Sequence, residues 1–359
     1  MKVSFVINEP IRNPSGGYKV VYTYANEMVR HGFDVTIYYH CRDNVLFSNY
    51  GLPMTTKLLI ARCLAHKGPK WFPLDKAVKR KIITQISNQQ IDNADAVIAT
   101  AADTASDVFR LSKAKGMKFY FIQGYEDWVM SKEELVQTYQ YDMKKITVSR
   151  WLRNLVESNC NDTVECVLNG IDSGIFYIQM PPELRKNHSI CMLFHDLESK
   201  GSKEGMDVIY RLQARYPDLT ANIFGVVPRP SYFPDWVVYT HNADQKQLRS
   251  IYNNSAIYLS PSWNEGFGLT GAEAMMSGCA LISTATDGAK EYTTSDNAIL
   301  VNIHDAEAMY AYCCELFDNA KLRCQIAERG AQEVTALLNY GNAVERFIGI
   351  LRNAVVGKE

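Results

Sequence analysis

The chain has 359 residues, a length that usually forms two domains rather than one. Hydrophobic residues make up 47% and charged residues 21% of it, a composition that excludes a disordered or fibrous protein. The formal net charge is −1, and no run approaches the roughly 18 uncharged apolar residues that a membrane span needs.

The first half of the chain alternates short β-branched runs with helical patterns, which is typical of parallel α/β sheets. The expected strands are 3–8, 35–40, 96–100, 119–123, 146–149 and 164–168. A helix is expected from Tyr18 to Arg30, with Gly32 as its stop signal. The first strand has four or five apolar residues before it turns polar, which is too short for the core of a signal peptide, so we expect a cytoplasmic protein.

The second half repeats this pattern. Its expected strands are 190–195, 221–224, 237–240, 256–260, 280–284 and 299–301. Residues 170–187 contain glycines and prolines without a clear period, and we interpret them as a linker between two domains. Residues 340–356 have apolar side chains spaced for a closing helix. The sequence therefore predicts two doubly wound α/β domains that face a cleft, in which ligands bind outside the carboxyl ends of the strands.

One stretch is strongly basic. Between Lys57 and Lys81 it has eight basic residues and one acidic residue, Asp75: the basic residues are Lys57, Arg62, Lys67, Lys70, Lys76, Lys79, Arg80 and Lys81. Apolar residues interleave with them, so the stretch is a candidate for contact with an anionic membrane surface or a phosphate-bearing acceptor. The alternative is a solvated helical face.

No metal site is expected. The nine cysteines are scattered and never form a Cys-x-x-Cys pair, which argues against a zinc site or a disulfide framework. No Asp-x-Asp motif occurs in a persuasive context either. We expect neither a metal nor another cofactor.

Residues 260–278 carry the strongest functional signal. A strand ends at Ser260, a loop with two glycines follows, and a helix begins near Gly268. The free N–H groups and positive dipole of a helix N-terminus suit a diphosphate. Glu265 precedes this anion site, and Glu273 lies roughly 7.5 Å further along, at ~1.5 Å rise per residue. One carboxylate would then face the sugar of a nucleotide-sugar and the other its ribose, although each glutamate taken singly fits a solvated helix-end charge.

These residues resemble the E-x7-E motif of retaining GT-B glycosyltransferases, inside the E-G-F-G-L-x-x-x-E-A-M-x-x-G signature of family 4, glycosyl transferases group 1. The resemblance implies that Glu265 contacts the hydroxyls of the donor sugar and Glu273 the ribose. It places the backbone of Phe267, Gly268 and Leu269 near the phosphates.

The resemblance also implies a domain organisation. The N-terminal domain, 1–169 together with 340–359, would hold the acceptor, and 188–339 would bind the nucleotide-sugar. Gly16 and Gly17 match the family's glycine loop, which faces the donor from the N-terminal domain. Glu126 and Asp127 are candidates for positioning an acceptor hydroxyl, with simple solvation as the alternative.

Two positions depart from the family pattern. Lys200 takes the place of the family's phosphate-binding lysine, but His195 stands where an arginine is usual, and Lys203 is a competing alignment for the lysine. A cation here would stabilise charge on the leaving diphosphate. The second departure is Gln123, which stands where a histidine often lies close to the reacting sugar. This pattern is similar to the subgroup that acts on surface polysaccharides.

We therefore expect a retaining, metal-independent hexosyl- or deoxyhexosyltransferase that acts in bacterial cell-surface polysaccharide or glycoconjugate synthesis. Its partners would be a nucleotide-sugar and a glycan or lipid-linked acceptor, with peripheral contact to an anionic membrane and no nucleic acid. The alternative is a non-catalytic GT-B subunit of a glycosyltransferase complex, because His195 and Gln123 depart from the pattern.

Overall fold

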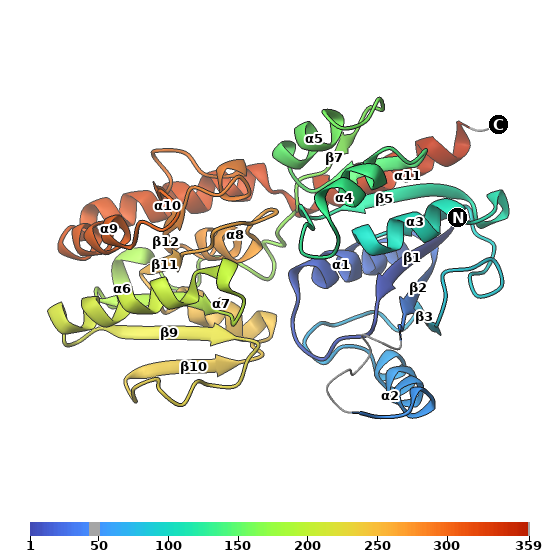
Figure 1. Ribbon diagram of the computed structural model, residues 1–359. Helices are drawn as coiled ribbons and strands as arrows, with labels where there is room; N and C mark the ends of the chain where they lie inside the picture. The colour runs from blue at the N-terminus through green and yellow to red at the C-terminus, as the bar shows by residue number, and fades with distance from the viewer. Residues whose placement is uncertain (43–50, 358–359) are drawn as a thin grey trace. The chain divides into compact units, whose positions relative to one another are not determined.

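The computed structural model describes residues 1–42 and 51–357. The chain forms two compact units (Figure 1). The first unit comprises Met1–Leu168 together with Asn342–Glu359, and the second comprises Asn169–Gly341.

The first unit is built on a seven-stranded sheet of order β3-β2-β1-β4-β5-β6-β7, in which every neighbouring pair is parallel. The strands are β1 (Lys2–Asn8), β2 (Asp34–His40), β3 (Lys79–Ile83), β4 (Ala96–Ala99), β5 (Met117–Ile122), β6 (Lys144–Thr147) and β7 (Glu165–Cys166). The helices are α1 (Gly16–Arg30), α2 (Met54–Lys67), α3 (Ala102–Arg110), α4 (Lys132–Tyr139), α5 (Arg150–Glu157) and α11 (Tyr340–Val356). A 3-10 turn, η2 (Lys113–Lys115), precedes β5.

The closing helix α11 packs into the core of the first unit. The ring of Phe347 stacks on Tyr24 of α1, with centroids 4.0 Å apart, and meets Phe121 of β5 edge-on at 5.2 Å. Val344, Phe347, Ile348 and Leu351 are all buried. The apolar spacing of this segment is therefore explained by its contact with residues more than 200 positions earlier in the chain.

The second unit has a six-stranded parallel sheet of order β10-β9-β8-β11-β12-β13. The strands are β8 (Ser189–Phe194), β9 (Thr220–Gly225), β10 (Val237–His241), β11 (Ile257–Ser260), β12 (Ala280–Thr284) and β13 (Ile299–Val301). The helices are α6 (Ser202–Arg215), α7 (Gln245–Asn253), α8 (Leu269–Met276), α9 (Ala306–Asp318) and α10 (Ala320–Leu337). The 3-10 turns are η3 (Pro182–Leu184), η4 (Glu198–Lys200) and η5 (Ala289–Glu291).

The segment 170–187, expected as a linker, is packed against the second unit. Buried Arg185 donates from its guanidinium to the carbonyl oxygens of Tyr252 and Ser255, at 3.1 and 2.9 Å. The same group also reaches the carbonyl oxygen of Met180. A buried guanidinium is stable only when its donors are paired, so these bonds attach the segment firmly to α7 and β11.

The sequence missed one strand, β3. Its sequence, Lys79-Arg80-Lys81-Ile82-Ile83, begins with three basic residues and lacks the apolar run typical of a parallel strand. As an edge strand it pairs with β2 alone, and edge strands tolerate charged side chains.

Candidate donor-side and acceptor-side sites

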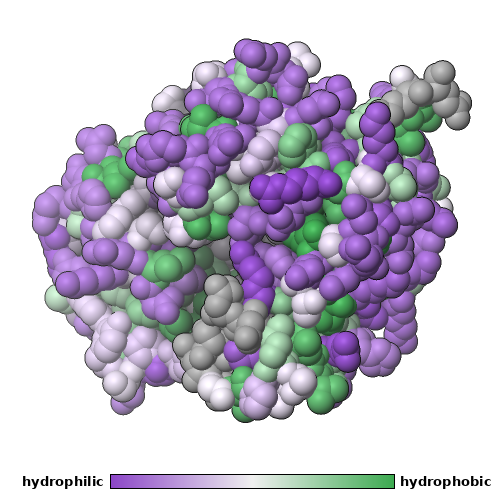
Figure 2. Space-filling view, turned by 45° about the vertical axis from the view of Figure 1, so that its right-hand side comes forward, coloured by the Kyte–Doolittle hydropathy of each residue, from purple (hydrophilic) through white to green (hydrophobic). Residues whose placement is uncertain are grey.

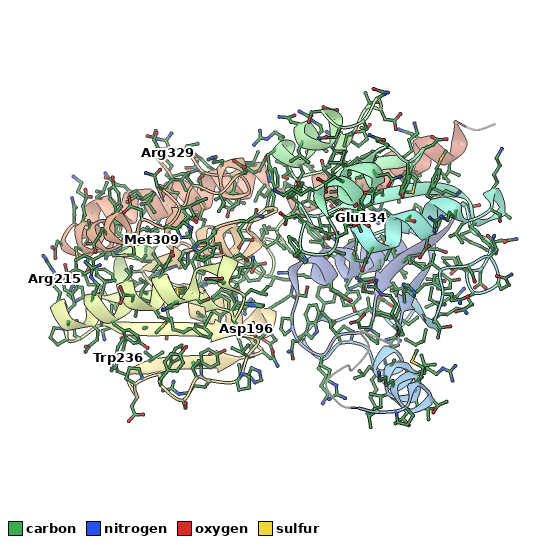
Figure 3. The ribbon with its side chains drawn as sticks, in the orientation of Figure 1. Glu134, Asp196, Arg215, Trp236, Met309 and Arg329 are labelled. Atoms are coloured by element: carbon green, nitrogen blue, oxygen red, sulfur yellow. The ribbon has the colours of Figure 1, made fainter. Side chains whose placement is uncertain are left out.

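Two loops meet at the carboxyl edge of the second sheet, because β8 and β11 are parallel neighbours. The loop after β8 leads into α6, and the loop after β11 leads into α8. Trp263 in the second loop donates its backbone N–H to the carbonyl of Ser199 in the first, at 2.8 Å. Figure 3 shows Asp196, from the first loop, at this end of the unit and Arg215 at the opposite end. The N-termini of two helices therefore open onto the same edge of the sheet.

Glycines begin both helices. Gly201 and Gly268 are the N-cap residues of α6 and α8, and both adopt left-handed backbone conformations, with φ of +60° and +83°. A Cβ on Gly201 would lie 2.0 Å from the carbonyl oxygen of Pro261, and one on Gly268 would lie 2.9 Å from the hydroxyl of Tyr292. That hydroxyl donates to the Gly268 carbonyl at 2.8 Å. Both glycines are thus required for conformation and for space.

Glu265 and Lys200 form an ion pair across the two loops. The Lys200 Nζ atom lies 2.8 Å from Glu265 Oε1, and the two side chains are only 26% and 18% exposed. The backbone of Glu265 is packed against Gly288, where a Cβ would come within 2.5 Å of the Glu265 carbonyl oxygen. The carboxylate is therefore held by a cation on one side and by a fixed backbone on the other.

His195 is the first residue of the loop after β8. Burial lowers the pKa of its imidazole, and the positive charge of Lys200 lowers it further, against the opposing effect of Asp196. Its Nδ1 atom lies 3.0 Å from the backbone N–H of Leu197, which it can accept only when Nδ1 carries no proton. Asp196 also lies 2.9 Å from Nδ1, an ion pair that would require the opposite state. The lowered pKa favours the neutral ring, whose remaining proton is on Nε2 and can be donated.

The two candidate lysines differ in their surroundings. Lys200 is partly buried and pairs with Glu265, whereas Lys203 is exposed in the first turn of α6. Either charge would add to the positive end of the helix. Which lysine makes the main phosphate contact stays a prediction, with the geometry favouring Lys200.

Glu273 is buried, with 2% of its surface exposed. The hydroxyl of Tyr252 donates to Glu273 Oε2 at 3.3 Å. The interpretation of this glutamate as a solvated charge is therefore wrong. Phe267 is also buried, while Leu269 is half-buried at the first position of α8. Tyr252 and Tyr292 are residues that sequence reasoning missed, because both lie outside the motif in the chain and approach it only in the fold.

In the first unit, the structure brings Gln123 to the N-terminus of α1. Gly16 and Gly17 are the first two residues of this helix. A Cβ on Gly17 would lie 3.5 Å from the Gln123 Nε2 atom. The glycine turn and the amide thus form one polar surface at the carboxyl ends of β1 and β5.

Glu126 and Asp127 have different environments. Asp127 is exposed, whereas Glu126 is mostly buried and accepts the backbone N–H of Ala102 at 2.6 Å, at the start of α3. Burial raises the pKa of Glu126 to about 7, and the nearby Asp103 raises it too, while the Ala102 N–H opposes them. Asp103 in turn pairs with Arg42, from the end of β2. The sequence analysis missed this pair. The signal in the sequence is Asp103 itself, the acidic residue in the first turn of α3.

The basic stretch does not form one helical face. Residues 54–67 form α2, residues 79–83 form the edge strand β3, and a turn-rich connection separates them. Lys57 is buried, and Arg80 points away from Lys79 and Lys81 because side chains alternate along a strand. The alternative of a solvated helical face is therefore wrong for the second half of the stretch, while contact with a membrane or an acceptor stays a prediction.

Within residues 1–42 and 51–357, no helix is both long and apolar enough to cross a membrane. Figure 2 shows a surface on which hydrophilic residues predominate and hydrophobic residues are interspersed. In the same ranges, no three His, Cys, Asp or Glu side chains gather in a way that would hold a metal ion. The expectation of metal-independent catalysis stays a prediction.

Comparison with known proteins agrees with the second unit's geometry. Residues 190–319 match the family model described as "Glycosyl transferases group 1". This range includes both loops, both helix N-termini and the Glu265–Lys200 pair. No curated protein matches the sequence significantly.

Solved structures match over nearly the whole chain. Sucrose-phosphate synthase from Thermosynechococcus elongatus is 13% identical with a TM-score of 0.73, and the match covers 99% of each chain. The fold is GT-B. Anabaena HepE in complex with UDP is 13% identical with a TM-score of 0.73, over 98% of this chain and 100% of HepE. A mutant of S. aureus TarM, in complex with Fondaparinux, alpha-GlcNAc-glycerol and UDP, is 10% identical with a TM-score of 0.72, over 98% and 99%. The family model relates the second unit to glycosyltransferases, and these solved structures show that the chain shares their fold.

Proposed function

We propose that this protein is a retaining glycosyltransferase that moves a hexosyl or deoxyhexosyl group from a nucleotide-sugar to a glycan or lipid-linked acceptor. One observation carries the proposal. The Glu265–Lys200 pair lies where two glycine-capped helix N-termini open onto one sheet edge, inside the range that matches glycosyl transferases group 1.

The donor diphosphate would bind at these helix N-termini. Free N–H groups and two positive dipole ends attract its negative charge, and Lys200 adds a full charge beside them. Glu265 would accept hydrogen bonds from the sugar hydroxyls, and Lys200 holds its carboxylate in place through the 2.8 Å contact. Neutral His195 would donate from Nε2 to a phosphate or sugar oxygen.

Retention follows from the resemblance to E-x7-E enzymes. The acceptor hydroxyl would attack the anomeric carbon on the face that the diphosphate leaves, and a diphosphate oxygen would take its proton. Positive charge that stabilises the leaving group is then the main catalytic requirement, and Lys200 with the helix dipoles supplies it. For this reason we propose that the reaction needs no divalent metal.

The first unit would hold the acceptor, next to the surface formed by Gly17 and Gln123. The second unit, Asn169–Gly341, would serve as the donor domain. The first unit, which includes α11, would serve as the acceptor domain. A role in bacterial surface polysaccharide synthesis and a contact with anionic membranes belong to the same proposal.

A donor screen tests the function directly. The purified protein is heated with a panel of nucleotide-sugars, beginning with UDP-sugars because the structures of HepE and the TarM mutant are complexes with UDP. A ligand at 100 times its Kd adds about 2.7 kcal/mol of stability. The stabilising donor is then incubated with the protein, and NMR of the released or transferred sugar gives the anomeric configuration. Inversion would refute retention, and stabilisation by no nucleotide-sugar would refute the proposal.

The alternative is a non-catalytic partner subunit, favoured by His195 in place of an arginine. Donor hydrolysis by the pure chain distinguishes the two functions. If the chain binds the donor but neither hydrolyses it nor transfers its sugar, even with each tested acceptor in excess, the result would support the partner subunit.

A further inference from the structure

One face of the first sheet is polar where parallel sheets are normally apolar. The register aligns Ser4 of β1 with Thr36 of β2 and Lys79 of β3, and the next row aligns Val6 with Tyr38 and Lys81, so only its β1 member is apolar. In-register residues of parallel strands point to the same face, so these side chains share one surface. Parallel sheets usually bury both faces under apolar side chains. A run of polar side chains here has no explanation in packing.

This polar face lies opposite α1 and α2. Tyr39, on the other face of β2, bonds to Tyr22 of α1 at 3.0 Å. Arg80, on the other face of β3, lies next to Gly68 at the end of α2. The polar face is bordered instead by the connection 84–95, from which Asp92 donates its N–H to the Tyr38 hydroxyl at 3.0 Å.

Between the sheet and this connection is a cavity of about 730 Å³. It lies at the amino ends of β1 and β2, at the edge of the sheet opposite Gly17 and Gln123. Its lining residues with charged side chains are Lys2, Asp34, Lys79, Lys81, Asp92 and Lys115. Four lysines against two aspartates leave an excess of two positive charges.

The ion pairs that line the cavity are weak. Lys79 Nζ lies 2.7 Å from Asp34, and Lys81 pairs with Asp92, but all four side chains are 40% or more exposed. Exposed pairs contribute about 0–1 kcal/mol each, so a ligand can replace them at little cost. Lys115 differs from these exposed lysines, because it is buried and donates a hydrogen bond to Asn93 at 2.9 Å.

The lining indicates the chemistry of the ligand. Besides its charges the lining offers the exposed amides of Asn88, Gln89 and Asn93, whereas Ser4 and Thr36 are buried. Carboxylates such as Asp34 and Asp92 accept hydrogen bonds from sugar hydroxyls. Tyr38 is fully buried, so its ring face is closed to a stacking base. A sugar that carries negative charge satisfies both the hydroxyl partners and the excess of positive charge.

We propose that this cavity, here named the lysine groove, is a second binding site that takes a short oligosaccharide bearing carboxylate or phosphate groups. It lies at the amino edge of its sheet and is separate from the polar surface at the carboxyl edge. Lys79 and Lys81 hold the acidic groups, and the exposed amides and carboxylates bind the sugar hydroxyls. The site does not depend on the donor reaction and stands whether or not the proposed function does.

The experiment measures binding by calorimetry without a donor. The probes are tetragalacturonic acid, glucose 6-phosphate, neutral maltotetraose and inorganic phosphate. The test variant is Lys79→Glu with Lys81→Glu, and the matched control is Lys132→Glu with Lys144→Glu, which changes the charge of the same unit equally at exposed positions. We expect tetragalacturonic acid to bind at least ~10-fold more tightly than maltotetraose, and the test variant to lose at least ~10-fold in affinity. The control variant should retain the wild-type affinity for tetragalacturonic acid. Donor hydrolysis should be unchanged in the test variant and in the control variant.

Four results would overturn the proposal. These are no binding of either charged sugar, an equal loss in the control, inorganic phosphate binding as tightly as the charged sugars, or a single-stranded RNA bound more tightly through the same two lysines. If the test variant does not fold, as judged by circular dichroism, Lys79→Gln with Lys81→Gln replaces it under the same criteria.

Discussion

The carboxyl edges of the two sheets are built differently. In the second unit, two left-handed glycines, a tyrosine bonded to a glycine carbonyl and a partly buried ion pair fix the loops. In the first unit, Gln123 lies against Gly17 and Asp127 is exposed. A site that recognises the same diphosphate in every reaction gains from fixed backbone donors, whereas a site for a variable acceptor depends on side chains. The predictions that follow test this difference, from the largest expected effect to the smallest.

The largest effect is expected for Glu265→Gln. The glutamine amide lacks the negative charge that pairs with Lys200, and it accepts hydrogen bonds from sugar hydroxyls more weakly than a carboxylate. Turnover should therefore fall at least ~100-fold, which corresponds to about 2.7 kcal/mol of activation free energy. Binding of the nucleoside diphosphate, followed by calorimetry, should change little. Near-normal turnover would remove Glu265 from the reaction, and Asp127→Asn, at the exposed acid of the other edge, provides the control.

Lys200→Ala should reduce turnover about 30- to 1,000-fold, since it removes a charge worth on the order of 2–4 kcal/mol to the leaving diphosphate. Lys203→Ala, at the exposed lysine three residues later, should cost less. Turnover is measured for both variants with and without excess EDTA. A larger loss in Lys203→Ala would reverse the two assignments, and activity that EDTA abolishes and Mg²⁺ restores would refute the metal-free mechanism.

Gly268→Ala should destabilise the second unit by about 1–2 kcal/mol, because a Cβ there is strained at positive φ and meets the Tyr292 hydroxyl. Gly17→Ala, a helical position without positive φ whose Cβ would have ordinary contact with Gln123, should leave the stability unchanged or raise it by up to about 1 kcal/mol. Urea unfolding of both variants measures the difference. Equal losses would mean that the two edges are equally constrained.

The smallest effect concerns Glu126 and pH. Its folded pKa, about 7, lies above the ordinary value of 4.5, so the folded state holds its proton more tightly than the unfolded state. The resulting stability is fully present below pH 4.5 and is lost as the pH rises to about 7. Glu126→Gln should flatten this slope between pH 4.5 and 7. A carboxyl pKa near 4.5, measured by NMR, would contradict the expected burial effect.

The sequence predicted the elements whose signal is local. Apolar β-branched runs located most strands, and the glycines around Phe267 located the start of α8. Strand β3 was missed because its first residues are basic, and pairing with β2 decides its conformation. The alternation of polar residues in β1 and β2 was visible in the sequence, but it gains meaning only from the register that aligns them.

The site was predicted in its parts and not in its contacts. The motif gave Glu265 and Lys200 separately, while their 2.8 Å contact depends on β8 and β11 being neighbours in the sheet. The burial of Glu273 depends on Tyr252, which comes from α7. Such contacts join residues 21 to 65 positions apart, beyond the range of any local pattern.

The return of α11 has a consequence for protein synthesis. Residues 342–357 follow the whole second unit in the chain, yet Phe347 fills the space between Tyr24 and Phe121 in the first unit. During translation, the first unit therefore lacks Phe347 from its aromatic core until the whole second unit has been synthesised. All the strands of the second unit are made before α11 is complete. The half of the protein that is made first is the half that can be completed last.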